Sequence, residues 1–135
     1  MIFLDTNILL YSIGTRQEDA SKAQVARALL DQRHAVLSVQ VLQEFYVQAT
    51  RASRPDPLPH DLAVAFIRTW RRFRIVDNTM ELLDAGLALK GHHNFSLWDC
   101  LIIAAAQASD CTTLYTEDMS HGRRFGNLVL CNPFL

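Results

Sequence analysis

Four acidic residues occupy positions from which their carboxylates could act together: Asp5, Glu44, Asp99 and Asp118. Carboxylate oxygens favour hard cations such as Mg²⁺, with Mn²⁺ as a substitute, over zinc. Such cations equip a protein for phosphodiester hydrolysis, because one ion activates water and another stabilises the leaving oxygen. Four converging acids would also repel one another unless they were protonated or bound to cations. The residue types therefore predict a metal-dependent hydrolase, provided that the four acids converge.

Three of these acids also have a simpler explanation, and the residues alone leave both explanations open. Asp5 is a preferred N-cap residue for a helix that begins at Thr6. Glu44 lies at the edge of an apolar helical stripe, where a solvated acid is ordinary. Asp118 is of a residue type that is common in turns. No acid decides the question by itself, so their joint placement is the deciding observation.

Asp99 could complete a capping box with Ser96, since the two residues fit the S/T-x-x-D/E pattern. The helix that follows is apolar on every side over residues 101–106, which predicts that it is buried. Asp99 should project beside Ile102 and Ala106 on that helix. A carboxylate at a buried face needs a hydrogen bond, a cation or a metal to replace lost water.

Short apolar segments of strand length alternate with helical segments along the chain. The predicted strands are 2–4, 35–37, 74–76, 113–115 and 128–130, and the predicted helices are 7–13, 18–33, 38–52, 60–72, 79–90 and 96–108. Gly91 is expected to end the fifth helix, and the proline-rich stretch 53–59 is expected to be a loop. This alternation predicts an α/β domain around a parallel sheet, in which ligands bind outside the carboxyl ends of the strands. Asp5 and Asp118 follow predicted strands and are expected at that end.

Composition narrows the class of protein. The chain has 135 residues, of which 50% are hydrophobic, with a net charge of −1, so we expect one packed domain over residues 1–135 rather than disorder. Uninterrupted apolar stretches such as 101–106 are far short of the roughly 20 residues of a membrane span. Three cysteines without a CxxC pair argue against a disulfide framework and a cysteine zinc site, and favour a reducing, cytoplasmic location.

Four segments together resemble the PIN domain, and within it the VapC-type ribonuclease toxins of prokaryotic toxin–antitoxin pairs. They are Asp5-Thr6-Asn7 after the opening apolar strand, Glu44 in Val-Leu-Gln-Glu-Phe, Ser96-Leu-Trp-Asp99 before Leu-Ile-Ile-Ala-Ala-Ala, and Thr116-Glu-Asp118. The resemblance covers essentially the whole chain. The combination is specific, although each segment alone is weak.

The resemblance implies a three-layer, Rossmann-like α/β fold with a central parallel sheet flanked by helices. It implies an Mg²⁺-dependent endoribonuclease that inhibits translation and growth, forms a homodimer and is neutralised by a cognate antitoxin whose tail covers the active site. Carried over by motif, the four acids are the catalytic residues, and Asp5, Asp99 and Asp118 are metal ligands. Thr6, Asn7 and Thr116 would orient the substrate or support the ligands. Glu117 is a second candidate for the role of Asp118.

Two pairs of arginines are candidates for contacts with RNA phosphates. Segment 51–74 carries six arginines against two aspartates, and within it Arg71 and Arg72 could bind RNA beside stacking aromatic residues at 70 and 73. It is equally open that those aromatic residues pack inward beneath a solvated helix face. Arg123 and Arg124, next to the acidic loop, could hold the substrate phosphate instead.

Two enzyme and signalling classes with similar acidic pockets fit the sequence poorly. A receiver domain would need adjacent acids after the first strand and a lysine after the last. A haloacid-dehalogenase-like phosphatase would need a second aspartate where this chain has Asn7. A non-catalytic domain of the same fold, which binds a partner or RNA while its acids cap helices, stays open. Metal binding separates that class from an enzyme.

Overall fold

Six strands form a single sheet in the computed structural model, which describes residues 1–135. The strands are β1 (Ile2–Leu4), β2 (Ala35–Ser38), β3 (Arg74–Val76), β4 (Thr113–Tyr115), β5 (Arg124–Phe125) and β6 (Leu128–Cys131). Their order is β3-β2-β1-β4-β6-β5, and every pair is parallel except β5 with β6. The predicted parallel α/β sheet is confirmed. The antiparallel strand β5 was not predicted, because two residues are too short to give a periodic pattern.

Helices connect the strands, and polar side chains set where several of them begin. The helical elements are α1 (Thr6–Ser12), η1 (Gln17–Asp19), α2 (Ala20–Leu30), α3 (Val39–Thr50), α4 (His60–Trp70), α5 (Met80–His92) and α6 (Leu97–Ala108). The hydroxyl of Ser38 accepts a hydrogen bond from the amide of Val41 at 3.2 Å, and Thr79 caps α5 in the same way. Such caps satisfy amides that have no partner inside the helix.

Two predicted helix boundaries were wrong. Gly91 lies inside α5, because it does not adopt the left-handed conformation through which a glycine ends a helix, and the chain leaves through His93 in an extended conformation. The segment predicted as one helix over 18–33 divides into η1 and α2 and ends at Leu30. The chain must turn after Leu30 to enter β2 at Ala35.

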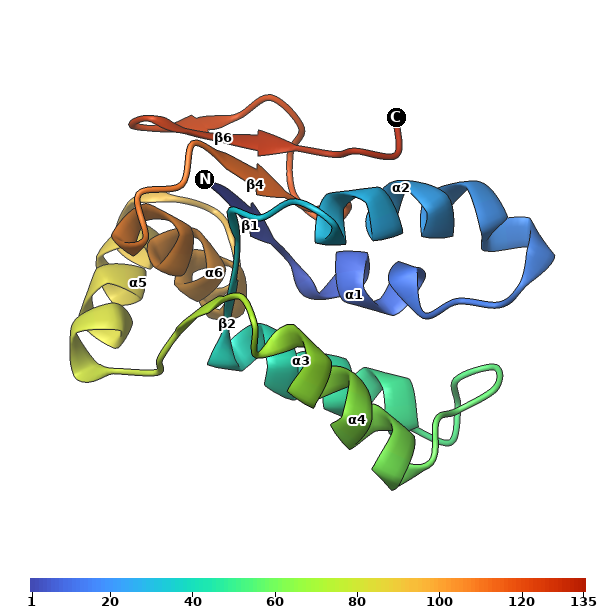
Figure 1. Ribbon diagram of the computed structural model, residues 1–135. Coiled ribbons are helices and arrows are strands. Elements are labelled where there is room, and N and C mark those ends of the chain that lie inside the picture. The colour runs from blue at the N-terminus through green and yellow to red at the C-terminus, as the bar shows by residue number, and fades with distance from the viewer.

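The helices pack in pairs around the sheet (Figure 1). Helices α1 and α2 lie together on one side of the strands in this view, and α5 and α6 lie together on the other. Helices α3 and α4 form a third pair, joined by the loop 51–59. The C-terminal end of the chain returns to the α1–α2 pair, where the rings of Tyr11 and Phe134 lie 5.0 Å apart.

One hydrophobic cluster of 28 buried residues joins the sheet to the helices. An aromatic group holds α3 against α4, with the rings of Phe45 and Trp70 4.6 Å apart. Trp70 and Phe73 are only 4% and 8% exposed, so they pack inward and are not available to stack on RNA bases. None of the helices combines the length and the apolar character that crossing a bilayer requires.

Candidate active site

The carboxyl ends of β1 and β4 bring two of the predicted site segments together. The two strands are parallel neighbours, with Leu4 paired to Tyr115. The amide of Asp5 continues the ladder by donating to the carbonyl of Tyr115 at 3.1 Å. Asp5 and Thr116 therefore leave the sheet side by side, although they are 111 positions apart in the sequence. Parallel strands deliver the residues that follow them to one end of the sheet.

Asp5 lies buried at that end and is held by two hydrogen bonds. Its Oδ1 accepts from the amide of Thr6 at 2.7 Å, and its Oδ2 accepts from the hydroxyl of Thr116 at 2.8 Å. Burial raises the pKa of Asp5 to about 7, with the negative charges of Glu44 and Asp118 adding to the rise and the two hydrogen bonds opposing it. Asp5 is thus both the N-cap of α1 and a neighbour of other acids.

The Glu44 side chain extends from α3 to the same end of the sheet as Asp5, and both of its carboxylate oxygens accept hydrogen bonds there. The hydroxyl of Thr6 donates to Oε2 at 2.9 Å, and the side-chain amide of Gln40 donates to Oε1 at 3.1 Å. Gln40 Nε2 also donates to the carbonyl of Trp98 at 3.1 Å, which ties α3 to the start of α6. Gln40 is a buried residue that the sequence analysis missed. Its position one helical turn before Glu44 was the available signal.

Asp99 lies in the first turn of α6, where its amide donates to the hydroxyl of Ser96 at 3.1 Å. This bond supplies one half of the predicted capping box. Burial raises the pKa of Asp99, the negative charges of Asp118 and Glu44 raise it further, and the Ser96 hydroxyl opposes the rise. Asp99 therefore also lies within electrostatic reach of the other acids.

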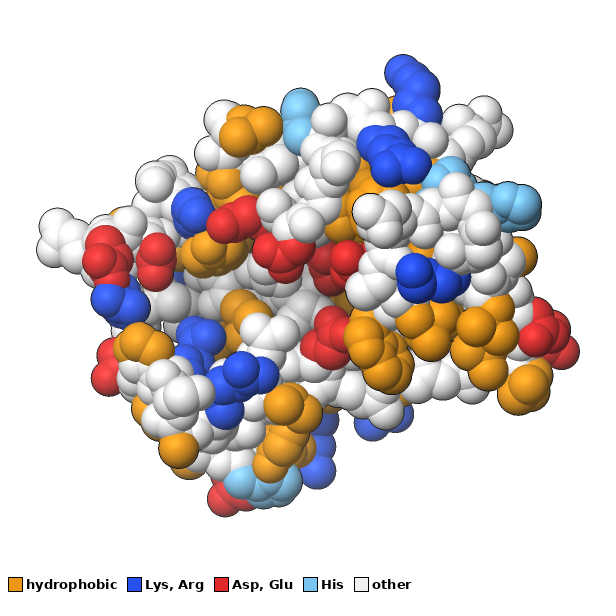
Figure 2. Space-filling model, turned by 180° about the vertical axis from the view of Figure 1, so that it is seen from behind, with side chains coloured by type: hydrophobic (Ala, Val, Ile, Leu, Met, Phe, Trp, Pro, Cys, Tyr) orange, Lys and Arg blue, Asp and Glu red, His pale blue; other side chains and the backbone are white.

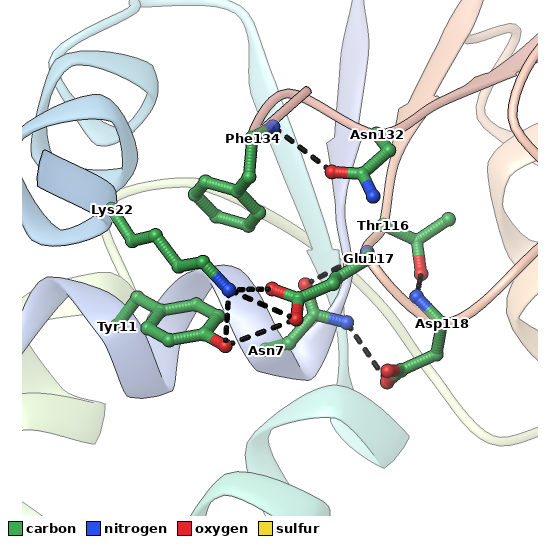
Figure 3. A network of polar contacts seen from close by, with 8 residues as sticks. All are labelled: Asn7, Tyr11, Lys22, Thr116, Glu117, Asp118, Asn132 and Phe134. Atoms are coloured by element: carbon green, nitrogen blue, oxygen red, sulfur yellow. Dashed lines mark hydrogen bonds and ion pairs between the residues drawn. The ribbon is translucent and has the colours of Figure 1, made fainter. Parts of the chain in front are cut away.

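Asp118 and Glu117 are neighbours in the sequence but take part in different contacts (Figure 3). Asn7 holds both residues, since its Nδ2 donates to Asp118 Oδ2 at 3.0 Å and its Oδ1 accepts from the Glu117 amide at 3.3 Å. The Glu117 carboxylate turns to Lys22 Nζ at 3.2 Å and to the Tyr11 hydroxyl at 3.1 Å. Asp118, and not Glu117, acts electrostatically on Asp5 and Asp99.

The four acids Asp5, Glu44, Asp99 and Asp118, here named the acidic group, have no basic partner. The ion pairs of the chain are Lys22–Glu117 and Arg16–Glu18, and neither includes a member of this group. Figure 2 shows acidic side chains gathered around a hollow on one face of the molecule. At about 4 Å, two carboxylates repel by roughly 1 kcal/mol in water and roughly 4 kcal/mol at an effective dielectric near 20. The group therefore carries negative charge that the protein itself does not neutralise.

This donor set fits a hard divalent cation, although the side chains do not enclose one. No three His, Cys, Asp or Glu side chains converge closely enough to form a ready metal site. The available donors are carboxylate oxygens, which suit Mg²⁺ or Mn²⁺, and their mutual repulsion is what a cation would relieve. The pKa of Asp5 is raised mainly by burial, and the negative charges of Glu44 and Asp118 add to that rise.

None of the four candidate arginines forms an ion pair with a member of the acidic group. Arg71 and Arg72 precede β3, whose first residue, Arg74, pairs with Val36 near the start of β2, so they lie at the end of the sheet opposite the acids. Arg72 also donates to the carbonyl of Leu30 at 3.2 Å. Arg123 stacks on Phe95 and Phe125 and bonds His93 Nδ1 at 2.9 Å. Both Arg123 and Arg124 are exposed; Arg124 is the first residue of β5, which pairs with β6, and Arg123 precedes it.

A cleft of about 390 Å³ opens beside the acidic group. Asn7 and Asp118 lie at one part of its lining, helix α1 and the end of α3 form its walls, and the loop 51–59 contributes Arg54 and Leu58. The proline-rich loop is therefore part of a hollow next to the acids.

Comparison with known proteins identifies the family of this chain. The family model for the PIN domain matches residues 2–124, whereas no curated protein matches the sequence. Among solved structures, the toxin–antitoxin complex from Klebsiella pneumoniae has a TM-score of 0.73 at 19% identity, over 98% of both chains. FitAcB from Neisseria gonorrhoeae has a TM-score of 0.72 at 16% identity, over 99% of both chains.

A third similar structure is Mycobacterium tuberculosis VapC20, described as a Sarcin-Ricin loop cleaving toxin. Its TM-score is 0.69 at 18% identity, and the match covers 87% of this chain and 92% of that one. At these identities the likeness is one of fold, and it agrees with the α/β sheet described above. With the family model matching almost the entire length, the chain belongs to the PIN domain family.

Proposed function

We propose that this protein is a metal-dependent endoribonuclease and the toxin of a toxin–antitoxin pair. The observation that carries the proposal is the acidic group, in which four carboxylates share one end of the sheet without a basic partner. Holding them together costs free energy in the protein alone, and a divalent cation would recover it. Asp5, Asp99 and Asp118 would hold Mg²⁺, or Mn²⁺ in its place, and Glu44 would complete the set.

A bound Mg²⁺ would supply the Lewis acidity that activates water for in-line attack and stabilises the leaving oxygen. Hydrogen bonds from other residues of the chain hold three of these carboxylates in position. Thr6 and Gln40 hold both oxygens of Glu44, while Thr116 holds Asp5 and Asn7 holds Asp118. These bonds reduce the rotation of each carboxylate and so pre-organise the donors. No residue of this set needs to form a covalent bond with the substrate.

The family and the similar folds support a proposal about the partners. One similar solved structure is described as a Sarcin-Ricin loop cleaving toxin, and another is a toxin–antitoxin complex. RNA is therefore the proposed substrate, and a cognate antitoxin that covers the acidic group is the proposed regulator. A homodimer and arrest of growth through cleaved RNA belong to the same proposal.

A second candidate function is a non-catalytic domain that binds a partner or RNA. It draws support from the capping contacts, since Asp5 accepts from Thr6 and the Asp99 amide donates to Ser96. It also draws support from the lack of three tightly convergent donors. The two functions differ in one property, which is whether the acids bind a divalent cation as a unit.

A thermal melt with and without Mn²⁺ or Mg²⁺ tests the proposal on the wild type and on Asp99→Asn. The cation should stabilise the wild type, by about 2.7 kcal/mol at a hundredfold excess over its dissociation constant. Asp99→Asn should not respond, whereas Asp84→Asn, at an exposed position on α5, should respond like the wild type. If neither the wild type nor the control responds, the binding-domain function is favoured.

A further inference from the structure

The cleft beside the acidic group contains a cation that the protein leaves without a partner. Arg54 lies in its lining, and its Nε is buried with no hydrogen-bond partner. The Arg54 side chain forms no ion pair either, because the ion pairs of the chain are Lys22–Glu117 and Arg16–Glu18. A buried guanidinium donor without an acceptor is unfavourable, so this position is suited to an anion supplied by a ligand.

None of the other charged residues that line the cleft forms an ion pair with Arg54. Arg16 is engaged with Glu18, and Glu117 is engaged with Lys22. Asp19 and Asp56 also line the cleft, but neither forms an ion pair with Arg54. Asp118 belongs to the acidic group at the other part of the lining.

The backbone keeps Arg54 in this place. The amide of Arg54 donates to the carbonyl of Arg51 at 3.1 Å, and the amide of Leu58 donates to the carbonyl of Ala49 at 2.8 Å. The second bond closes the loop onto the end of α3. Prolines at 55, 57 and 59 restrict the chain around these bonds. Arg54 is therefore presented by a fixed loop rather than by a free one.

The size and lining of the cleft suit one nucleotide. Its volume of about 390 Å³ is near the lower end of small-molecule sites, which are about 300–1,000 Å³. Leu10, Ile13 and Leu58 offer apolar contacts to a base or a sugar, while Asn7 and Gln48 offer amide donors and acceptors. A single unstacked nucleotide is what single-stranded RNA can place in such a hollow.

We propose that this cleft binds the nucleotide next to the bond that is cut, with the backbone phosphate of that nucleotide on Arg54. The inference rests on the proposed nuclease function, since it names a subsite of the same substrate. The planar guanidinium can donate two parallel hydrogen bonds to a phosphate, which an ammonium group cannot do. Arg54 thus positions the RNA strand relative to the acidic group.

Fluorescence anisotropy with a labelled single-stranded RNA of mixed sequence tests the proposal. All chains carry Asp99→Asn, so that the probe stays intact. Adding Arg54→Gln should weaken binding about tenfold and lower the slope of log affinity against log salt by about 0.7, the value for one phosphate contact on a single strand. Arg54→Lys should keep the slope but bind more weakly than the parent. The matched control is Arg51→Gln, exposed and outside the cleft lining, and it should change neither value.

Unchanged affinity and slope in Arg54→Gln overturn the subsite, and so does a parent that does not bind the probe at low salt. An NMR titration of the unsubstituted protein with a nucleoside 5′-monophosphate does not depend on any variant folding. Shifted amide signals of Ser53, Arg54 and Asp56 are expected, and their absence contradicts the proposal. The Mn²⁺ melt reports separately on the acidic group, so a failed subsite and a failed nuclease function are distinguishable.

Discussion

Glu117 and Asp118 are adjacent in the sequence, yet the protein balances the charge of only one of them. The Glu117 carboxylate lies against Lys22 Nζ and the Tyr11 hydroxyl (Figure 3). The hydrogen bonds of Lys22 with Tyr11 and Glu117 raise the pKa of Lys22, which keeps the ammonium charged. Asp118 turns the other way, and its carboxylate receives a neutral donor, the side-chain amide of Asn7.

This difference separates an acid whose charge the fold neutralises from acids whose charge the fold leaves without a basic partner. At Glu117 a cation of the chain neutralises the charge, so the contact is complete. Around Asp118 the neighbours are more carboxylates, and the pKa values of Asp5 and Asp99 are raised by burial and by those charges. Uncompensated acids at the carboxyl end of a parallel sheet are costly unless something else binds them.

Asp99→Asn should give the largest effect, because it removes a charge from the acidic group with almost no change in shape. We expect RNA cleavage to fall by about 100-fold or more, the scale on which loss of one electrostatic contact to the reacting centre is felt. Timed cleavage of an RNA substrate in Mg²⁺ measures this. Asp84→Asn on the exposed face of α5 should keep the wild-type rate. Full activity in Asp99→Asn would remove that residue from the mechanism.

Asp5→Asn should change how stability depends on pH in the absence of divalent ions. Folding raises the pKa of Asp5 from its ordinary value of 3.8 to about 7, so between these values the folded state holds a proton that the unfolded state has lost. Stability from this group is therefore greatest at low pH and falls as pH rises toward 7, by roughly 1.4 kcal/mol per unit of pKa difference.

Urea unfolding at about pH 5 and about pH 8 checks this sign. The wild type in EDTA should lose stability toward the higher pH, and Asp5→Asn should lose less of it. Asparagine keeps an oxygen for the Thr6 amide, so the cap on α1 remains. Identical pH profiles for the two proteins would mean that Asp5 is not the titrating group.

Separate substitutions of Glu117 and Asp118 test which of the two carboxylates takes part in cleavage. Asp118→Asn should lower cleavage about tenfold and leave the unfolding midpoint unchanged or higher, because it relieves repulsion within the acidic group. Glu117→Gln should keep most of the cleavage rate and lower the free energy of unfolding only slightly, as expected for a solvent-accessible ion pair. Kinetics and urea unfolding on both variants measure the two effects. The reverse pattern would assign the catalytic role to Glu117.

The smallest effect is expected from the four candidate arginines, which form no ion pair with the acidic group. Replacing Arg123 and Arg124 by Gln should weaken RNA binding a few-fold and lower the salt slope by about 0.7 for each phosphate that is no longer bound. The matched double variant at Arg71 and Arg72 should bind as the wild type does, because those residues lie at the opposite end of the sheet. Equally weakened binding in both double variants would mean that RNA is held by general charge alone.

Local patterns were enough to predict most elements of the fold. Each of the five predicted strands is present, and Ser38 and Ser96 cap the helices expected of them. These strands and caps depend on a few consecutive residues, so they can be predicted from the sequence alone. The strand β5, the break before α2 and the passage of α5 through Gly91 were missed, because each depends on where the chain must go next.

The candidate acids could also be named from the sequence, since residue type and position after a strand are local facts. What only the tertiary structure decided is which charges are balanced. Lys22 comes from α2 to neutralise Glu117, Gln40 reaches from α3 to the carbonyl of Trp98, and no basic residue pairs with Asp118. Burial and charge pairing depend on residues far apart in the chain, so they exist only once the sheet and its helices have assembled.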